Sequence, residues 1–397
     1  MKSIDQLDLK GKRVFIRVDF NVPKDDAGNI TDDTRIRAHV PTIKLVIGKG
    51  GKAILASHLG RPKGKRSEKH TLKPVAGRLS ELIGKDVKFL DDCIGDEVEK
   101  ATLAMKDGEV VLLENLRFHA EEEKNDREFA KNLAKLCDVY VDDAFATAHR
   151  AHASNAGITE FVKECAVGPL LKNEIDYLKK ATVDPEHPVV AIIGGAKVSD
   201  KIKVLENLLE KVDRLIIGGG MAFTFVRAQG HDVGKSLCEE EMLDVARSIM
   251  DKATKKNVKL LLPVDCVVAD RAAADAAVKV VGIDAIPGDW MGLDIGPETT
   301  KLFGEAVRDA RTIVWNGPMG MFELAPFSKG TFELAAAVAG SPGVSIVGGG
   351  DTDTAIHQAG VSDKISYIST GGGAFLEVLE GKTMPAVDAL EKCGGGA

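Results

Sequence analysis

The segment FIRVDFNVP, residues 15–23, begins as an apolar run and ends in charged and polar side chains. Other apolar runs in the first part of the chain end in the same way: AILASHLGRP (53–62), VVLLENLRF (110–118) and VYVDDAFATAHR (139–150). Ligands of open α/β sheets bind just beyond the carboxyl ends of the strands. The pattern therefore predicts a sheet edge that carries arginine, histidine and acidic side chains.

The apolar runs of the second half end in glycine instead: VVAIIGGAK (189–197), RLIIGGG (214–220), TIVWNGPMG (312–320) and VSIVGGGDT (344–352). Glycine lets the backbone approach a ligand closely, and a following helix offers unpaired N–H groups and a positive dipole end. One half is thus suited to a small anion, and the other to the phosphates of a nucleotide.

The composition describes an ordinary globular protein of 397 residues, long enough for two or three domains, with 44% hydrophobic and 28% charged residues. The net charge of −7 argues against nucleic acid or a membrane surface as a partner. The six cysteines form no CxxC pair, so neither a zinc site nor a disulfide framework is expected. The polar N-terminus and the lack of a transmembrane-length run favour a cytoplasmic protein.

Strand-like runs alternate with amphipathic helical stretches, which predicts an α/β fold with parallel sheets. Helices are expected over 71–84, 168–181 and 199–212, and from 351 or 352 to about 360. The turn-rich VDPEHP (183–188) follows the second of these, and a new strand–helix series begins at Val189. The expected organisation is a domain over 1–168, a linking helix and hinge over 169–188, a domain over 189–378 and a C-terminal segment over 379–397.

GGGDT (348–352) is the strongest glycine motif, because a strand leads into it and a helix follows at once. Asp351 suits Mg²⁺, which prefers a carboxylate together with substrate phosphates, or it caps the helix. Lys197 and Lys201 lie four residues apart and face either phosphate or solvent. A P-loop, a GxGxxG after the first strand and the protein-kinase HRD and DFG elements are all missing.

Several cationic and polar residues lie at or just after strand ends or turns of the first half: Asp19, Asn21, Arg35, His58, Arg61, Arg117 and Arg150. Arginine makes bidentate contacts with phosphate and carboxylate and keeps its charge near neutral pH. A single arginine would be an ordinary ion pair, but several at one edge would be costly without an anion. His58 is open to three interpretations: a phosphorylated nucleophile, a donor to the anion or a structural histidine.

Taken in order, the motifs closely resemble the phosphoglycerate kinase family over essentially the whole chain. They are RVDFNVP (17–23), SHLGRP (57–62), ENLRF (114–118), TAHRAHAS (147–154), GGAKVSDK (194–201), GGGMAFTF (218–225), WNGPMGMFE (315–323), GGGDT (348–352) and STGGGA (369–374). The resemblance implies two Rossmann-like domains that face each other across a hinged cleft. It also implies a C-terminal helix that returns to the first domain.

The resemblance implies substrates and residue roles. The first domain is expected to bind 3-phosphoglycerate or 1,3-bisphosphoglycerate through Asp19, Phe20, Asn21, Arg35, His58, Leu59, Gly60, Arg61, Arg117 and Arg150. The second is expected to bind MgADP or MgATP: Lys197, Lys201, Asn316, Gly349, Gly350, Asp351 and Thr352 around the phosphates, Glu323 at the ribose, and Gly219, Gly220 and Gly292 near the adenosine. Arg35, Lys201, Gly349 and Gly350 are the expected catalytic residues, and Asp351 the Mg²⁺ ligand.

The implied activity is that of a glycolytic kinase, which moves a phosphoryl group reversibly between 1,3-bisphosphoglycerate and ADP. The reverse acceptor is a carboxylate, ionised near pH 7, so no general base is needed. Catalysis is then expected to rest on positioning of the substrates and stabilisation of charge, with direct in-line transfer after domain closure. The family expectation is a monomer. The alternatives are another small-molecule kinase, a nicotinamide enzyme or a non-catalytic nucleotide- or anion-binding protein.

Two positions depart from the family pattern. Ala146 stands where glycine is usual, and Asn155 stands where a more apolar residue is commoner. Neither is a family contact residue, so altered local packing and retained activity are expected.

Overall fold

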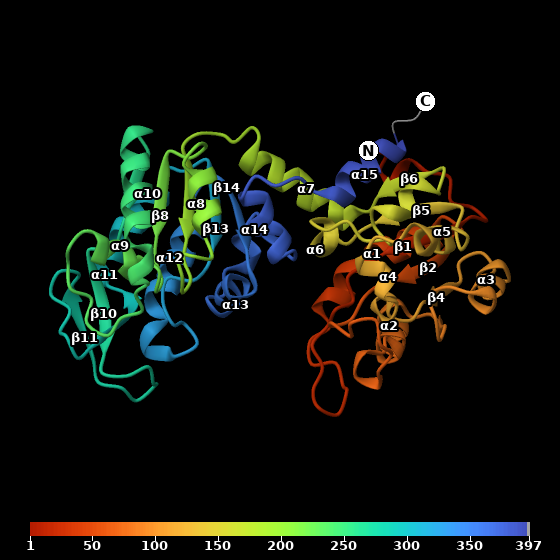
Figure 1. Ribbon diagram of the computed structural model, residues 1–397, viewed down its shortest axis with the longest axis horizontal. Coiled ribbons are helices and arrows are strands. Elements are labelled where there is room, and N and C mark those ends of the chain that lie inside the picture. Colours follow the sequence, from red (N-terminus) through yellow and green to blue (C-terminus); the bar gives the residue numbers. More distant parts are fainter. Residues whose placement is uncertain (395–397) are drawn as a thin grey trace. The chain divides into compact units, whose positions relative to one another are not determined.

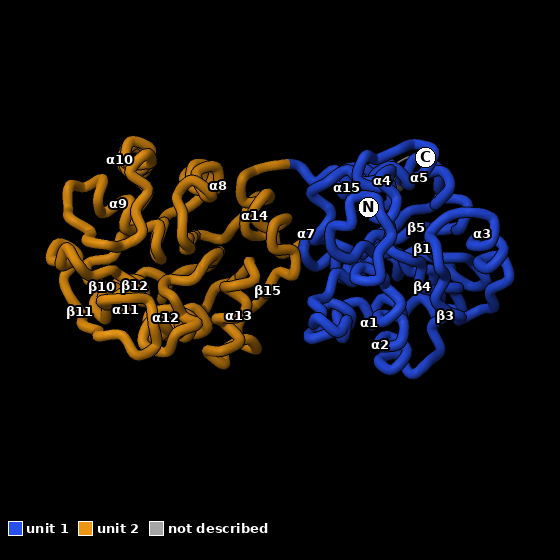
Figure 2. The backbone as a smooth tube through the Cα atoms, turned by 60° about the horizontal axis from the view of Figure 1, so that its bottom comes forward, with its two compact units in different colours: residues 1–175, 383–397 blue, residues 176–382 orange. Residues whose placement is uncertain are grey.

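The computed structural model describes residues 1–394. The chain forms two compact units, which Figure 2 shows in separate colours. Unit 1 comprises residues 1–175 and the C-terminal segment from Thr383, and unit 2 comprises Asp176–Lys382. The division falls inside α7 (Pro169–Thr182), within the segment expected to link two domains.

Unit 1 is built on a six-stranded sheet with the order β3-β4-β2-β1-β5-β6. All neighbouring strands are parallel, as the alternation of strands and helices predicts. The strands are β1 (Arg13–Arg17), β2 (Lys52–Ala56), β3 (Val87–Phe89), β4 (Val110–Leu112), β5 (Val139–Asp142) and β6 (Cys165–Val167).

Both faces of this sheet are buried, which explains why its strands are almost continuously apolar. Along β1, Val14 and Ile16 pack in the core with residues of α1 (Thr34–Gly48) and α2 (Lys73–Ile83). Phe15 points to the opposite face, where its ring centroid lies 6.0 Å from that of Tyr140 on β5.

The other helices of unit 1 are short. They are α3 (Asp96–Leu103), α4 (Ala120–Glu123), α5 (Arg127–Ala134), α6 (Phe145–Ala148) and α15 (Pro385–Gly394), with 3-10 turns η1 (Ile4–Gln6), η2 (Glu68–His70), η3 (Leu116–Phe118) and η4 (Gly157–Glu160). The helix expected over 71–84 is α2. It ends at Gly84, whose φ of 68° is the left-handed conformation that glycine adopts without strain.

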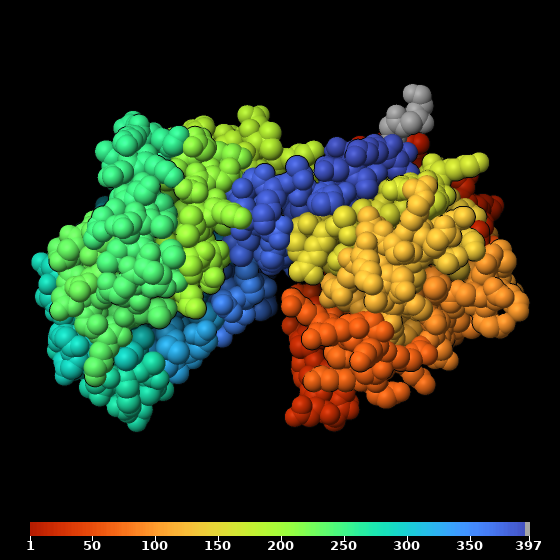
Figure 3. Space-filling model, in the orientation of Figure 1, coloured from red at the N-terminus to blue at the C-terminus, as the bar shows by residue number. Residues whose placement is uncertain are grey.

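The C-terminal helix α15 lies on the surface of unit 1, where it contacts β6, η4 and α6 (Figures 1 and 3). A disulfide joins Cys165 of β6 to Cys393 of α15, with the Cα atoms 6.0 Å apart. The cysteine spacing indicated no disulfide framework, so this single bond was not predicted. The two cysteines are separated by 228 residues, and only the return of α15 to β6 brings them together. Residues 395–397 of the expected C-terminal segment lie outside the described residues.

Unit 2 is built on a second parallel six-stranded sheet, with the order β15-β14-β13-β7-β8-β9. Its strands are β7 (Val189–Ile193), β8 (Arg214–Ile217), β9 (Lys259–Leu261), β13 (Thr312–Asn316), β14 (Val344–Gly348) and β15 (Tyr367–Ser369). Its helices are α8 (Ile202–Leu208), α9 (Ala222–Ala228), α10 (Leu243–Lys255), α11 (Pro297–Val307), α12 (Lys329–Ala339), α13 (Gly350–Gln358) and α14 (Gly373–Leu379), with 3-10 turns η5 (Glu240–Met242), η6 (Ala325–Phe327) and η7 (Ser362–Lys364).

A small antiparallel sheet in unit 2 was not predicted. It has the order β11-β10-β12, formed by β10 (Asp265–Ala269), β11 (Val278–Gly282) and β12 (Met291–Ile295). Its buried face packs with α9, where Phe223 and Val226 share a cluster with Val268.

Two helix starts in unit 2 differ from the prediction. The helix expected from Ser199 begins only at Ile202, because Ser199 is engaged elsewhere: its Oγ donates to Glu239 Oε1 at 2.6 Å. The helix expected from residue 351 or 352 begins at Gly350, with Gly349 as its N-cap at a φ of 105°. Within residues 1–394, every helix is too short or too polar to cross a lipid bilayer.

Candidate functional site

The arginine-bearing edge of unit 1 lies beyond four neighbouring strands, β4, β2, β1 and β5. These strands are parallel, so the segments that follow them emerge at the same edge of the sheet. The fold thereby brings Asp19, His58 and Arg117 to one edge although they are far apart in sequence.

Asp19 is the anchor of this edge. Its Oδ2 accepts from Arg35 Nη1 at 2.7 Å, which joins the end of β1 to the first turn of α1. Its backbone N–H donates to His39 Nε2 at 2.9 Å, and His39 Nδ1 lies 3.0 Å from Asp143 Oδ2. The position of Arg35 is thus fixed through a buried network that reaches the end of β5.

The loop after β2 is held from two sides. Asn21 Oδ1 accepts from Gly60 N at 2.8 Å, and Arg117 Nη1 donates to Gly60 O at 2.9 Å. The side chains of Phe20 and Leu59 are buried in the core, so of these residues only the backbone is available to a ligand. Arg61 is exposed, so its side chain is free to reach an anion.

Arg17 was missed in the sequence, where it stands inside an apolar strand run. It is fully buried, with its Nε donating to Ser154 Oγ at 2.9 Å and its Nη2 3.3 Å from His58 Nδ1. Burial, with the charges of Arg17 and Arg117, holds the pKa of His58 well below its ordinary value. His58 is therefore neutral, and because Arg17 donates to Nδ1, its Nε2 carries the proton and is a donor. A donor role agrees with this environment better than a nucleophilic one.

The two departures from the family pattern lie near Arg150. Asn155 is fully buried and makes three hydrogen bonds: Nδ2 donates to Thr147 O and Arg150 O, both at 3.0 Å, and Oδ1 accepts from His152 N at 2.8 Å. It therefore fixes the loop that carries Arg150. Ala146 lies in α6, and it is not among the non-glycine residues with positive φ, so alanine is not strained there.

The glycine-bearing edge of unit 2 also lies beyond four neighbouring strands, β14, β13, β7 and β8. A chain of hydrogen bonds crosses it: Lys201 Nζ donates to Asn316 Oδ1 at 2.5 Å, and Asn316 Nδ2 donates to Gly348 O at 2.6 Å. Thr352 Oγ1 accepts from Gly317 N at 2.7 Å. Burial lowers the pKa of Lys201, and the charges of Asp200, Glu380 and Asp351 partly offset that effect.

A cavity of about 470 Å³ opens at this edge, and several predicted residues line it: Gly219, Gly220, Gly292, Glu323 and Asp351. Its apolar wall includes Phe223, Pro318 and Met319, which were not predicted. Close packing explains one glycine, because a Cβ on Gly292 would lie 2.1 Å from Cζ of Phe223. The cavity has the size and the apolar lining that a small-molecule ligand needs.

The other predicted nucleotide residues lie outside the cavity lining. They are Lys197, Lys201, Asn316, Gly349, Gly350 and Thr352. Lys197 and Lys201 both precede α8, so they do not share a face of that helix, and Lys197 is exposed. Asp351 is not the helix cap, because Gly349 occupies that position. The carboxylate of Asp351 is exposed in the first turn of α13, so it is available to bind a ligand.

These two sheet edges, one cationic and one glycine-rich with a lysine and a carboxylate, define the class of two-domain α/β enzymes that act on phosphorylated small molecules. A family model described as phosphoglycerate kinase matches residues 4–382. The chain therefore belongs to the phosphoglycerate kinase family, whose members are glycolytic kinases.

Individual relatives agree over nearly the full length. The chain is 59% identical over 395 residues to a phosphoglycerate kinase of Geobacter metallireducens, with 99% of each chain covered. It is 57% identical to a cytosolic phosphoglycerate kinase of Triticum aestivum, with 98% of each covered. The structure of the Coxiella burnetii phosphoglycerate kinase superimposes with a TM-score of 0.91 at 48% identity, with 98% of each chain covered. The Pyrococcus horikoshii structure gives 0.86 at 35% identity, with 100% of each covered.

Proposed function

We propose that unit 1 binds 3-phosphoglycerate or 1,3-bisphosphoglycerate at its arginine-bearing edge, and that unit 2 binds MgADP or MgATP at its glycine-bearing edge. The enzyme moves a phosphoryl group reversibly between the acyl phosphate and ADP. The observation that carries this assignment is the contrast between the edges. Arg35, Arg61 and Arg117 lie at the edge of unit 1, whereas unit 2 offers backbone N–H groups, the half-buried Lys201 and a cavity.

Arg35 and Lys201 stabilise the charge of the transferring phosphoryl group in this proposal. Arg35 suits the role because Asp19 binds one side of its guanidinium and leaves other donors free. The N–H groups at the start of α13, from Gly349 and Gly350, provide further donors, as helix N-termini do for phosphate.

The transfer needs no general base, because the acceptor carboxylate is already ionised near neutral pH. Neutral His58 then acts as a hydrogen-bond donor to the substrate, and the phosphoryl group passes directly and in line. Inversion at phosphorus is expected, and retention would contradict direct transfer.

Mg²⁺ enters with the nucleotide, and Asp351 is the residue that we propose holds it. The fit rests on an exposed carboxylate that lines the cavity and lies in the first turn of α13. One carboxylate plus phosphate oxygens is the ligand set that Mg²⁺ favours. The ion would neutralise phosphate charge.

Substrates bound to separate units react only if the units bring them together. We propose hinge closure in residues 169–188, by a monomeric cytoplasmic enzyme. Small-angle scattering should show compaction when 3-phosphoglycerate and MgATP are both present, and the same radius of gyration with and without the two ligands would contradict closure.

The direct test is to incubate the purified protein with MgATP and 3-phosphoglycerate and to trap the acyl phosphate with hydroxylamine. We expect a hydroxamate, and none with glycerate, which lacks the phosphate that the arginines bind. Nucleotide binding without any hydroxamate would instead indicate a non-catalytic binding protein.

A further inference from the structure

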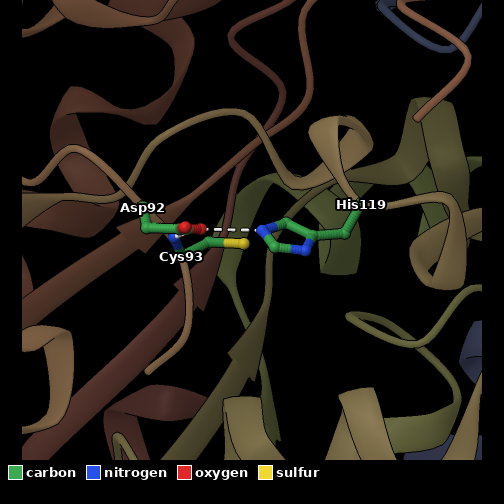
Figure 4. Close-up of side chains that lie close together, drawn as sticks. All are labelled: Asp92, Cys93 and His119. Atoms are coloured by element: carbon green, nitrogen blue, oxygen red, sulfur yellow. Dashed lines mark hydrogen bonds and ion pairs between the residues drawn. The ribbon is translucent and has the colours of Figure 1, made fainter. Parts of the chain in front are cut away.

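Asp92, Cys93 and His119 form a cluster outside the residues assigned to either substrate (Figure 4). Asp92 and Cys93 follow β3, and His119 follows η3 after β4, so the pairing of β3 with β4 brings them together. Asp92 Oδ1 lies 2.7 Å from His119 Nε2, and one ligand atom from each residue lies within 4.8 Å of the others. Figure 4 shows the carboxylate and the thiol both pointing toward the imidazole ring.

The local structure holds these groups in place. The backbone N–H of Cys93 donates to Asp92 Oδ1 at 2.7 Å, which fixes the carboxylate beside the thiol. The backbone N–H of His119 donates to Leu116 O at 3.2 Å, and the imidazole packs against the ring of Phe129, with centroids 5.2 Å apart. A ligand that binds here meets groups that are already oriented.

The charges around the thiol favour a cation. Burial raises the pKa of Cys93, and the negative charges of Asp92 and Glu122 raise it further. The same carboxylates that disfavour a free thiolate attract a metal ion, and a bound cation reverses their effect on the thiol. Arg66 is a positive charge near Asp92, and it favours the ionised carboxylate.

The cluster is closed on one side and open on the other. Cys93 is fully buried, whereas the side chain of Asp92 is 48% exposed and that of His119 is 26% exposed. An ion can therefore enter from solvent and keep a water ligand. Thiolate, imidazole and carboxylate are the groups that bind Zn²⁺, and three protein ligands with one open position is a recurring zinc arrangement.

We propose that Asp92, Cys93 and His119 bind a divalent cation of the zinc class. The ion binds the thiolate of Cys93, whose proton passes to solvent. It also binds the lone pair of His119 Nε2, which is freed when the proton that Nε2 shares with Asp92 moves to Nδ1 through solvent. Asp92 then binds the ion instead of the imidazole. These residues form no CxxC pair, which is why their spacing did not indicate a zinc site.

The test is a Cd²⁺ titration of the full-length, metal-stripped protein in its disulfide-bonded form, without nucleotide or phosphoglycerate. We expect thiolate-to-cadmium charge-transfer absorption that saturates at one ion per chain and is abolished by competing Zn²⁺. Cys93→Ser should remove the absorption, and Asp92→Asn and His119→Gln should each weaken binding on the order of tenfold or more. Cys238→Ser is the matched control, because Cys238 is a partly exposed free thiol outside the cluster.

Unchanged absorption in Cys93→Ser, or its loss in Cys238→Ser, would overturn the proposal. If Cys93→Ser fails to fold, Asp92→Asn provides the test, because Asp92 is half-exposed and asparagine has nearly the same volume. A wild-type affinity of Asp92→Asn for Cd²⁺ would equally overturn the proposal. No readout involves phosphoryl transfer, so the outcome is independent of the proposed function.

Discussion

Nη1 of Arg35 donates to Oδ2 of Asp19 at 2.7 Å, across the junction of α1 and the end of β1. The Arg35 side chain is 39% exposed and that of Asp19 is 9% exposed. The carboxylate is thus a buried anchor, and it orients a guanidinium that still reaches solvent. This is the geometry expected of an arginine that is positioned in advance for an anion.

We predict that Arg35→Ala lowers kcat on the order of 10³-fold or more, because it removes the charge that we propose acts on the transition state. ADP affinity should stay almost unchanged, since Arg35 belongs to unit 1. Steady-state kinetics would check the first expectation and calorimetric ADP titration the second. Arg37→Ala is the matched control: Arg37 lies on the same helix but pairs with Asp33. A near-normal kcat in Arg35→Ala would refute the assigned role.

Gly349 and Gly350 form a matched pair at the start of α13. A Cβ on Gly349 would lie 2.7 Å from Asn316 Nδ2, and its φ of 105° is one that alanine adopts only with strain. A Cβ on Gly350 would meet no atom within 4 Å. We predict that Gly349→Ala lowers the melting temperature of unit 2 and displaces Asn316 from Lys201, whereas Gly350→Ala leaves stability unchanged. Equal melting temperatures for the two variants would contradict this reading of Gly349.

Asn155→Ala should weaken 3-phosphoglycerate binding without affecting the nucleotide. The substitution removes three hydrogen bonds, from Asn155 to Thr147 O, Arg150 O and His152 N. These hydrogen bonds hold the loop that carries Arg150. Unpaired buried groups cost about 1–3 kcal/mol each. We expect a several-fold higher KM for 3-phosphoglycerate with an unchanged KM for MgATP. Asn132→Ala, on α5, serves as the control, and a similar rise in both KM values would argue for general damage instead.

Buried His152 should make unit 1 sensitive to acid. Burial, with the charges of Arg17 and Arg117, lowers its pKa from 6.5 to about 3. Below pH 6.5 His152 binds a proton in the unfolded chain but stays neutral in the folded protein. The free energy of unfolding is therefore unaffected by His152 above pH 6.5 and decreases as the pH falls from 6.5 toward 3. At pH 5 the loss is about 2 kcal/mol.

Urea unfolding at pH 5 and pH 7.5 would measure this effect. His152→Gln should reduce the difference between the two pH values, and His357→Gln, an exposed position in unit 2, should not. Buried His58 contributes in the same direction, so some pH dependence should remain in His152→Gln. An undiminished pH dependence would show that His152 does not stay neutral.

The sequence predicted the parts of the fold that local patterns encode. Both parallel sheets follow from apolar runs, and α2 ends at Gly84 as its stop signal indicates. The antiparallel sheet around β10 was missed because β11 is largely exposed and lacks a clear apolar pattern. The return of the C-terminal helix to the first domain was predicted, but not that it would place Cys393 beside Cys165 of β6, because the sequence does not say which strand the helix contacts.

The placement of the candidate site residues in the fold was predictable only in part. Side chains at strand ends, such as Asp19 and Asn316, could be located because parallel strands end at one edge. Arg17 and the cavity wall at Phe223 were missed, because their surroundings come from distant segments. Ser199 misled the helix prediction, since its preferred partner, Glu239, is 40 residues away.

The central claim is that the two edges bind different substrates, and calorimetric titration of two variants with both ligands tests it most directly. Arg61→Ala should lose at least about tenfold in 3-phosphoglycerate affinity and keep its ADP affinity, because Arg61 is exposed and is one of the proposed anion contacts. Lys201→Ala should lose ADP affinity and keep its affinity for 3-phosphoglycerate. Lys203→Ala, at an exposed position nearby, is the control. Loss of the same ligand in both variants, or of neither ligand in either, would contradict the account.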